Sequence, residues 1–278
     1  MMKLGNFVWR LGTRTYIMGI LNVTPDSFSD GGRFVQTEAA TGHACRLVEE
    51  GADIIDVGGE STRPGHREVN AEEEIARVLP VVKALKKELA IPVSVDTYKA
   101  SVAEACLKAG ADMVNDVWGL QREPEIARVA AYYGAPVVAM HNQDGTDYEG
   151  DILVAMKDFF EKTLEIAFKA GIAKENIILD PGIGFGKTAE QNIQVMGRLN
   201  ELRVMGYPVL LGTSRKSTIG KILDLPPDQR VEGTIATTVL GIQQGVDIVR
   251  VHDVQANRRA ALVADAIVRG YMPWTASV

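Results

Sequence analysis

Short apolar runs recur along the chain, each placed just after a helical stretch that ends in glycine. Three copies share one pattern: Gly51-Ala52-Asp53-Ile54-Ile55, Gly110-Ala111-Asp112-Met113-Val114 and Gly245-Val246-Asp247-Ile248-Val249. Glycine just past a helix end adopts the left-handed cap conformation. A short run that is apolar on both faces is typical of a buried parallel strand. The pattern therefore predicts a repeated unit of helix, tight turn and strand.

The same pattern predicts eight strands, with a helix after each. The strands are expected at 15–21, 53–57, 92–96, 112–116, 136–140, 176–180, 208–212 and 247–251. The helices are expected at 37–50, 71–89, 98–109, 124–133, 152–170, 188–205, 230–244 and 255–269. Alternating strands and helices indicate a parallel sheet. Eight units in 278 residues favour a single (β/α)8 TIM barrel over the alternative, an open doubly wound sheet.

The first 14 residues predict a short N-terminal β-hairpin that caps the base of the barrel. Residues 7–10 are apolar enough for a strand, Leu11-Gly12 is a candidate turn, and the chain then continues from Thr13 into the first barrel strand. We therefore expect a hairpin over 1–14 and one barrel domain over 15–270.

Composition narrows the class of protein. The chain is 46% hydrophobic and 24% charged, which is typical of a globular protein. With 30 basic and 36 acidic residues its net charge is −6, which disfavours sequence-independent nucleic-acid binding. Two cysteines are too few for a disulfide framework. Arg10 and Arg14 interrupt the first apolar stretch, so it does not resemble a signal peptide. We expect a cytoplasmic protein that binds neither nucleic acid nor membrane.

Polar side chains follow every predicted strand. They are Asn22, Asp56, Asp96, Asn115 with Asp116, His141, Asp180, residues 214–216 and residues 250–253. In TIM barrels the catalytic residues lie at these carboxyl ends. A structural barrel would use some of them as helix caps, for which Asp26, Ser29 and Asp253 are candidates. Polar groups at all eight exits favour an active site. Two long polar loops, 21–32 and 58–65, support it, because long loops in compact barrels are usually functional.

Seven segments of the chain carry a resemblance to a known family. They are MGILNVTPDSFSDGG (18–32), GGESTRPG (58–65), SVDT (94–97), ND (115–116), DPGIGFGK (180–187), SRKS (214–217) and RVHDV (250–254). Over residues 15–265 the chain resembles the dihydropteroate synthase family. The resemblance implies a transferase of folate biosynthesis that joins p-aminobenzoate to (7,8-dihydropterin-6-yl)methyl diphosphate and releases diphosphate. It also implies a homodimer, for which the apolar stretch 233–242 is a candidate interface.

The resemblance assigns the pterin to Asp96, Asn115 and Asp180, with Lys216 beside them. Carboxylates and amides suit this role because the pterin edge presents N–H donors and a carbonyl. The catalytic set implied is Asp180, Lys216, Arg63 and Asp30. For Asp30, either proton acceptance or ordering of the first loop is expected.

Cationic and oxygen-bearing residues are implied for the diphosphate. Arg250 and His252 alternate along the last strand and so point the same way, as a diphosphate clamp requires. Arg63 and Thr62 are assigned beside them, and Asn22 is implied as the protein ligand of Mg²⁺. One protein oxygen is sufficient, since Mg²⁺ keeps several waters and bridges to substrate phosphates.

The p-aminobenzoate site is expected between the loops. Phe28, Pro64 and Phe185 would supply apolar walls, and Thr62 and Ser217 would supply hydroxyls. We expect the pterin diphosphate to bind first. We also expect a largely dissociative displacement, in which the neutral arylamine attacks after the carbon–oxygen bond has mostly broken.

Three alternatives are set against this interpretation. A nucleotide-binding loop at 182–188 fails because Pro181 stands where the P-loop needs glycine. A methyltetrahydrofolate methyltransferase-type barrel resembles the chain at the pterin positions but is expected to lack the first loop and the SRKS segment. A non-catalytic pterin binder is expected to have lost Arg63, Lys216 or His252, which are all present.

Overall fold

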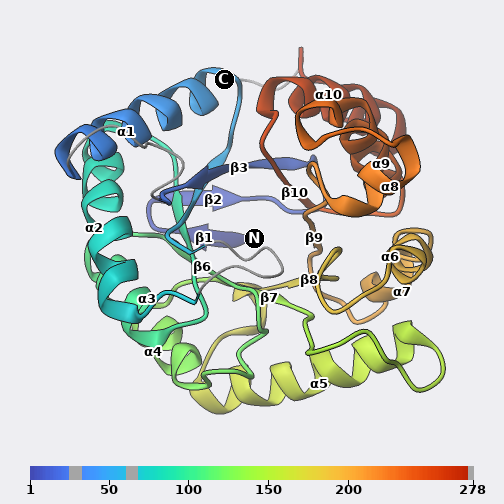
Figure 1. Ribbon diagram of the computed structural model, residues 1–278, viewed down its shortest axis with the longest axis horizontal. Coiled ribbons are helices and arrows are strands. Elements are labelled where there is room, and N and C mark those ends of the chain that lie inside the picture. Colours follow the sequence, from blue (N-terminus) through green and yellow to red (C-terminus); the bar gives the residue numbers. More distant parts are fainter. Residues whose placement is uncertain (25–32, 61–67, 275–278) are drawn as a thin grey trace.

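The computed structural model describes residues 1–24, 33–60 and 68–274, and eight parallel strands form its centre (Figure 1). The strands are β3 (Tyr16–Asn22), β4 (Ile54–Gly58), β5 (Val93–Asp96), β6 (Met113–Asp116), β7 (Val137–Met140), β8 (Ile177–Asp180), β9 (Leu210–Leu211) and β10 (Ile248–Val251). Their order is β8-β7-β6-β5-β4-β3-β10-β9. A parallel bridge between Leu179 and Val209 joins the two outer strands. The predicted TIM barrel is therefore confirmed, and the open sheet is wrong.

Helices surround the barrel (Figure 1). They are α1 (Arg33–Glu49), α2 (Ala71–Glu88), α3 (Ala100–Lys108), α4 (Glu125–Tyr133), α5 (Ile152–Ala170), α6 (Ala189–Met196), α7 (Asn200–Arg203), α8 (Ser217–Leu223), α9 (Val231–Gln243) and α10 (Val254–Arg269). The single helix expected at 188–205 is wrong, because it divides after Gly197 into α6 and α7. Helix α8 was not expected, since seven residues are too few to show a helical period. Two 3₁₀ turns, Lys174–Asn176 and Pro227–Gln229, were also not expected.

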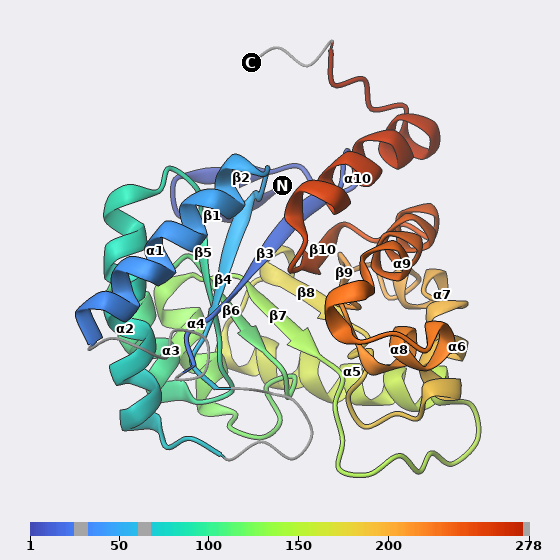
Figure 2. The same cartoon turned by 45° about the horizontal axis from the view of Figure 1, so that its top comes forward.

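The N-terminal hairpin covers the base of the barrel (Figure 2). It pairs β1 (Met2–Leu4) with β2 (Phe7–Trp9) in antiparallel register. Its turn therefore lies at residues 5–6. The turn expected at residues 11–12 is present, with the N–H of Thr13 donating to the carbonyl of Arg10 at 3.2 Å, but it leads toward β3 and does not join the two strands of the hairpin. The reason is that Met2 and Leu4 are buried on either side of exposed Lys3, so the first residues form a strand. Met2, Leu4 and Trp9 pack with inward-facing strand residues into one apolar cluster.

The repeated aspartates near the strand starts tie neighbouring strands together at the base. Asp53, Asp112 and Asp247 each accept a hydrogen bond from a backbone N–H of the adjacent strand. The donors are Ile17, Val93 and Val209, at 2.8, 2.8 and 3.1 Å. Each aspartate also pairs with a cation, respectively Arg14, Lys86 and Arg203, at 2.7, 2.6 and 2.5 Å. The glycine-containing repeat thus supports the end of the barrel that lies opposite the polar strand exits.

Across residues 1–24, 33–60 and 68–274, no helix has both the length and the apolar character that a bilayer crossing requires.

Candidate active site

Polar side chains from four strands meet at Arg250 of β10. Arg250 donates from Nε to Oδ2 of Asp56 and from Nη2 to Oδ2 of Asp96, both at 2.6 Å. Asn115 of β6 also donates to Oδ2 of Asp56, at 2.9 Å. The side chain of Asp56 is 0% exposed and that of Asp96 is 7% exposed. The carboxyl ends of β4, β5, β6 and β10 therefore form one buried, charged cluster.

Asp180 and Lys216 complete this cluster from β8 and from the segment that follows β9. A Cβ built at Gly212 would lie 3.9 Å from Oδ2 of Asp180, 4.0 Å from Nζ of Lys216 and 3.9 Å from Cβ of Arg250. The three groups therefore surround one point, and the missing side chain of Gly212 leaves space between them. The structure thus brings together five residues that the sequence assigned to the site: Asp96, Asn115, Asp180, Lys216 and Arg250.

The cluster is rich in acceptor oxygens. Oδ1 of Asp56 and Oδ1 of Asp96 are buried and have no hydrogen-bond partner in the part of the chain that the structure describes. Buried polar atoms are normally paired, so these oxygens are suited to accept N–H groups from a ligand. Burial raises the pKa of Asp96 and Asp180, an effect opposed by Arg250 at the first and by Lys216 at the second. Both pairings favour the carboxylate form.

Lys216 links the segments that follow β8 and β9. It lies immediately before α8, donates to the carbonyl of Ile183, and its Nζ lies 4.6 Å from the centre of the Phe185 ring. Burial lowers the pKa of Lys216 to about 8, and the charge of Asp180 opposes this shift. Ser217, the first residue of α8, is exposed. Of the two residues assigned to p-aminobenzoate here, Phe185 thus lies against the lysine ammonium, and Ser217 follows Lys216 directly in the chain.

His252 lies just beyond β10 and is only partly buried. Its backbone N–H donates to Oγ of Ser214 at 3.1 Å, and its Nδ1 lies 3.0 Å from the same oxygen. Ser214 therefore fixes both the backbone and the ring of His252. The next residue, Asp253, pairs with Arg215 at 2.5 Å. The histidine is held between the ends of β9 and β10, beside the buried cluster.

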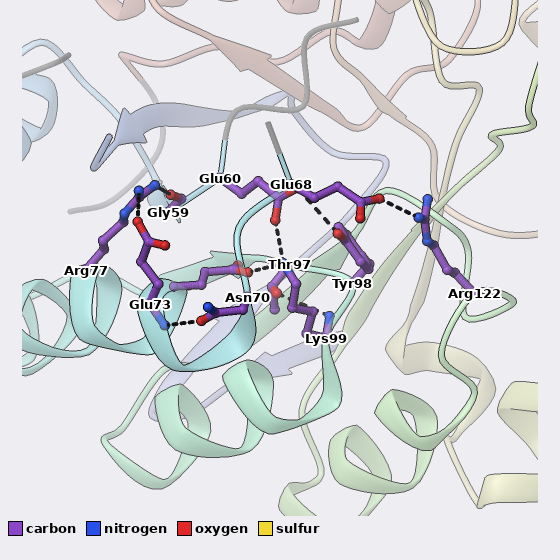
Figure 3. Close-up of polar contacts among 11 residues, drawn as sticks. Gly59, Glu60, Glu68, Asn70, Glu73, Arg77, Thr97, Tyr98, Lys99 and Arg122 are labelled. Atoms are coloured by element: carbon purple, nitrogen blue, oxygen red, sulfur yellow. Dashed lines mark hydrogen bonds and ion pairs between the residues drawn. The ribbon is translucent and has the colours of Figure 1, made fainter. Parts of the chain in front are cut away.

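The two ends of the second predicted loop are held by a second polar network (Figure 3). Glu60 pairs with Lys99, whose ammonium also contacts Glu74 at 2.5 Å. Tyr98 donates to Glu60 at 3.3 Å. On the other side of the loop, Glu68 pairs with Arg122 at 2.8 Å. These contacts come from α2, from the start of α3 and from the segment after β6.

Five residues assigned from the sequence lie outside the described residues. They are Phe28, Asp30, Thr62, Arg63 and Pro64. Their predicted roles stay predictions.

Asn22 ends β3 at the rim of the cluster. A Cβ built at Gly58 would lie 3.8 Å from Oδ1 of Asn22 and 3.5 Å from Oδ2 of Asp96, so the glycine leaves space between two oxygens. The described residues contain no group of three or more His, Cys, Asp or Glu that could hold a metal ion. The amide oxygen of a partly exposed asparagine near a carboxylate oxygen fits Mg²⁺, which needs oxygen ligands and retains waters.

Two residues of the cluster region have roles that the sequence did not indicate. Asp56 was noted at a strand end but not assigned to the site, although it accepts from both Arg250 and Asn115. Its position near the carboxyl end of a buried strand was the available signal. Asp116 instead accepts from the backbone N–H groups of Trp118 and Leu120 at 2.8 and 2.7 Å. It therefore stabilises a turn.

Fold and cluster together define a class: a (β/α)8 barrel with a buried, acceptor-rich cluster of polar side chains at the carboxyl ends of its strands, where such barrels hold their active sites. The family described as pterin binding enzyme matches residues 18–252. A dihydropteroate synthase of Clostridium beijerinckii is 55% identical over 272 residues, covering 96% of this chain and 100% of the relative. The chain belongs to the dihydropteroate synthase family of pterin-binding enzymes.

Solved structures agree with this assignment. A dihydropteroate synthase from Clostridium difficile, crystallised in the presence of pteroic acid, has a TM-score of 0.93 and 62% identity, covering 94% of this chain and 100% of that one. The Xanthomonas albilineans enzyme with 4-aminobenzoic acid has a TM-score of 0.88 and 44% identity, covering 94% of each chain.

Proposed function

We propose that the chain is a dihydropteroate synthase that uses the Arg250 cluster as its pterin site. It condenses p-aminobenzoate with (7,8-dihydropterin-6-yl)methyl diphosphate and forms 7,8-dihydropteroate and diphosphate. The observation that carries this proposal is the pair of buried acceptor oxygens on Asp56 and Asp96 that lack a partner among the described residues, with both carboxylates held at Arg250 and Oδ2 of Asp180 close to the same arginine. A pterin edge with several N–H donors satisfies such a set, whereas an apolar ligand would leave it unpaired.

Asp96, Asn115 and Asp180 bind the pterin in this proposal. The two carboxylates accept N–H donors of the ring, and the amide of Asn115 can donate or accept. Asn115 is already oriented by its hydrogen bond to Asp56. Asp56 therefore acts as a positioning residue. The pteroic acid of the Clostridium difficile crystal structure supports a pterin ligand for this family.

Arg250 and His252 bind the diphosphate, together with Arg63 and Thr62 from the second loop. Arg250 is 19% exposed, so its guanidinium borders both the buried carboxylates and the more open side of the cluster. His252 lies on that side, held by Ser214. Asn22 would hold Mg²⁺, which when bound neutralises charge on the leaving diphosphate.

The charges in the cluster suit a displacement in which bond breaking leads. As the carbon–oxygen bond of the substrate breaks, positive charge develops on the reduced pterin and negative charge on the diphosphate. Asp96 and Asp180 stabilise the first, and Arg250, His252 and Arg63 stabilise the second, because fixed charges in a buried site act strongly on developing charge. The neutral arylamine is nucleophilic, so no strong base is required, and Asp30 receives or relays the released proton.

p-Aminobenzoate binds between Phe185 and Ser217 on one side and Phe28, Thr62 and Pro64 on the other. The ring of Phe185 is held next to Lys216, and the hydroxyl of Ser217 is exposed to receive the carboxylate. The 4-aminobenzoic acid of the Xanthomonas albilineans structure supports this substrate. Binding is ordered, with the pterin diphosphate first.

A diphosphate-release assay tests the function. Wild-type protein with both substrates and Mg²⁺ is expected to release diphosphate, and release is expected to depend on p-aminobenzoate. Asp180→Asn and Arg250→Ala are expected to lower kcat/KM by about 100-fold or more, since each removes a charge that acts on the transition state. The exposed Asp158 and Arg128 provide matched controls as Asp158→Asn and Arg128→Ala. Methyl transfer from methyltetrahydrofolate without diphosphate release would favour the methyltransferase alternative.

We also propose a homodimer formed through α9 and its neighbour α10. Leu240 of α9 and Ile267 of α10 are 57% and 79% exposed, although both are large apolar residues. The stretch 233–242 that the sequence indicated lies in α9. Analytical ultracentrifugation is expected to give twice the 30.2 kDa chain mass, and Leu240→Glu is expected to shift the protein toward the monomer. A wild-type monomer at micromolar concentration would contradict this.

The cytoplasmic location and the domain limits 1–14 and 15–270 stay predictions.

A further inference from the structure

Lys187 is a buried cation in the segment after β8 that the proposed reaction does not use. The residue is 8% exposed. Its Nζ donates to the carbonyls of Gly182 and Phe185, each at 3.0 Å, and lies 2.8 Å from Nδ1 of His141. An ammonium group has three N–H donors. Three acceptors therefore surround it, and the lysine joins the segment after β8 to the end of β7.

His141 is fixed in the role of acceptor. It is 2% exposed, and its ring packs edge-on against Phe159 at 4.8 Å. Burial lowers the pKa of His141 to about 3, and the charge of Lys187 lowers it further in the same direction. The imidazole is thus neutral across the working pH range, and Nδ1 can accept from the ammonium.

The segment that Lys187 holds also orients Asp180. The backbone N–H of Gly182 donates to Oδ1 of Asp180 at 2.7 Å, and the N–H of Phe185 donates to the carbonyl of Gly182 at 3.1 Å. A Cβ at Gly182 would lie 1.9 Å from the carbonyl oxygen of His141, so this backbone packs directly on the end of β7. Loss of the lysine contacts would release the turn that orients the carboxylate.

The charge of Lys187 also acts on Asp180. The charged and titratable groups that face the lysine are Asp180, Lys216 and His141, and Tyr148 donates to the neighbouring carbonyl of Gly186 at 2.7 Å. The ammonium lowers the pKa of Asp180, against the larger effect of burial. Burial lowers the pKa of Lys187 itself to about 7. The lysine is therefore charged at acidic pH, where its charge favours the carboxylate form of Asp180.

We propose that Lys187 is a positioning residue of the synthase site, which through His141 and the carbonyls of Gly182 and Phe185 holds Asp180 in place and in its carboxylate form. This inference rests on the proposed function, because it assigns the pterin to Asp180. Lys187 acts through Asp180 and contacts neither substrate.

The pH profile of kcat/KM for the pterin diphosphate tests this role. Lys187→Met removes the charge and the donors, so the acid limb of the profile is expected to move to higher pH by about half a unit or more. Lys187→Arg keeps the charge, and its acid limb is expected to stay within about 0.2 unit of wild type. Lys162→Met, at an exposed position of α5, is the matched control and is expected to leave the profile unchanged.

A lysine that only stabilises the fold would lower the unfolding temperature of Lys187→Met and leave its acid limb in place, and that result would overturn the proposal. An equal shift in Lys187→Arg would overturn it as well. If Lys187→Met does not fold, Lys187→Gln replaces it, since this variant keeps two N–H donors without the charge. Calorimetry measures the affinity for pteroic acid across the same pH range, and the fall of this affinity at acidic pH provides a second measurement. If the wild type shows no turnover, the proposed function fails, and the binding profiles alone decide the role of Lys187.

Discussion

The guanidinium of Arg250 lies 2.6 Å from Oδ2 of Asp96, so the cation assigned to the leaving group is paired with a carboxylate assigned to the pterin. The pair is deeply placed, with side-chain exposures of 19% and 7%. Arg250 is therefore a bridge between two halves of the proposed site. Its second contact, with Asp56, is equally short. This contact keeps the guanidinium in place when a ligand also binds to Asp96.

Asp96→Asn is expected to lower kcat/KM for the pterin diphosphate by about 100-fold, mainly through kcat. The amide keeps the shape but removes the charge that stabilises the cationic pterin in the transition state. Steady-state kinetics with Asp158→Asn as the control measures the effect. Arg250 retains its contact with Asp56, so circular dichroism is expected to show a folded variant. Full activity in the folded variant would remove Asp96 from the pterin site.

A second prediction concerns the alkaline limb of the reaction. Since the pKa of Lys216 is lowered to about 8, the ammonium is present below that pH and is lost as the pH rises through it. Because the ammonium is assigned beside the pterin, where it donates to the ring, kcat/KM is expected to fall above about pH 8. Lys216→Arg, whose guanidinium stays charged, is expected to remove this limb from the range below pH 10, at a lower maximum rate. A limb that remains near pH 8 in Lys216→Arg would assign it to another group.

The third prediction separates stability from catalysis. Asp53 accepts from the backbone of Ile17 at the base of the barrel and pairs with Arg14, at the end opposite the candidate site. Asp53→Ala leaves a backbone donor and a partly buried cation without this acceptor, so the free energy of unfolding is expected to fall by about 2 kcal/mol. Chemical denaturation measures the free energy of unfolding, and Asp158→Ala, at an exposed position, is the control.

At temperatures where Asp53→Ala is folded, its kcat/KM is expected to stay within about twofold of wild type. A larger kinetic effect would show that the base is coupled to the site.

Much of the barrel could be predicted because its strands are buried on both faces and therefore read as continuous apolar runs. Strand β4 was expected at 53–57 and lies at Ile54–Gly58, and the other strands agree similarly well except β9, which was expected at 208–212 and covers only Leu210–Leu211. Elements without such a run were missed or misplaced. Helix α8 has seven residues, and the helix expected at 188–205 contains Gly197, whose effect on the helix depends on tertiary packing.

The site could be predicted as a set of residues but not as a set of contacts. Parallel strands bring their carboxyl ends to one edge, so Asp96, Asn115 and Arg250 were expected together. Which carboxylate pairs with Arg250 depends on distances that no spacing along the chain determines, and the role of Asp56 was missed for this reason. Lys187 was considered only as the last residue of the DPGIGFGK segment and as part of a failed nucleotide-binding pattern, and it was given no role of its own. Its burial against His141 becomes visible only when β7 and β8 are side by side.

The last prediction concerns Mg²⁺. Oδ1 of Asn22 lies 3.8 Å from the position of a Cβ at Gly58, near Oδ2 of Asp96, and the described residues provide no multi-carboxylate metal cage. Binding is therefore expected to be weak and to depend on the phosphate oxygens of the substrate. Chelation with EDTA is expected to abolish diphosphate release, and added Mg²⁺ is expected to restore it.

Asn22→Ala tests the proposed protein ligand of Mg²⁺. The Mg²⁺ concentration for half-maximal rate is expected to rise by about tenfold or more, because the remaining ligands of the ion come from substrate and water. Asn176→Ala, in the 3₁₀ turn before β8, is the matched control. An unchanged Mg²⁺ requirement in Asn22→Ala would place the ion elsewhere.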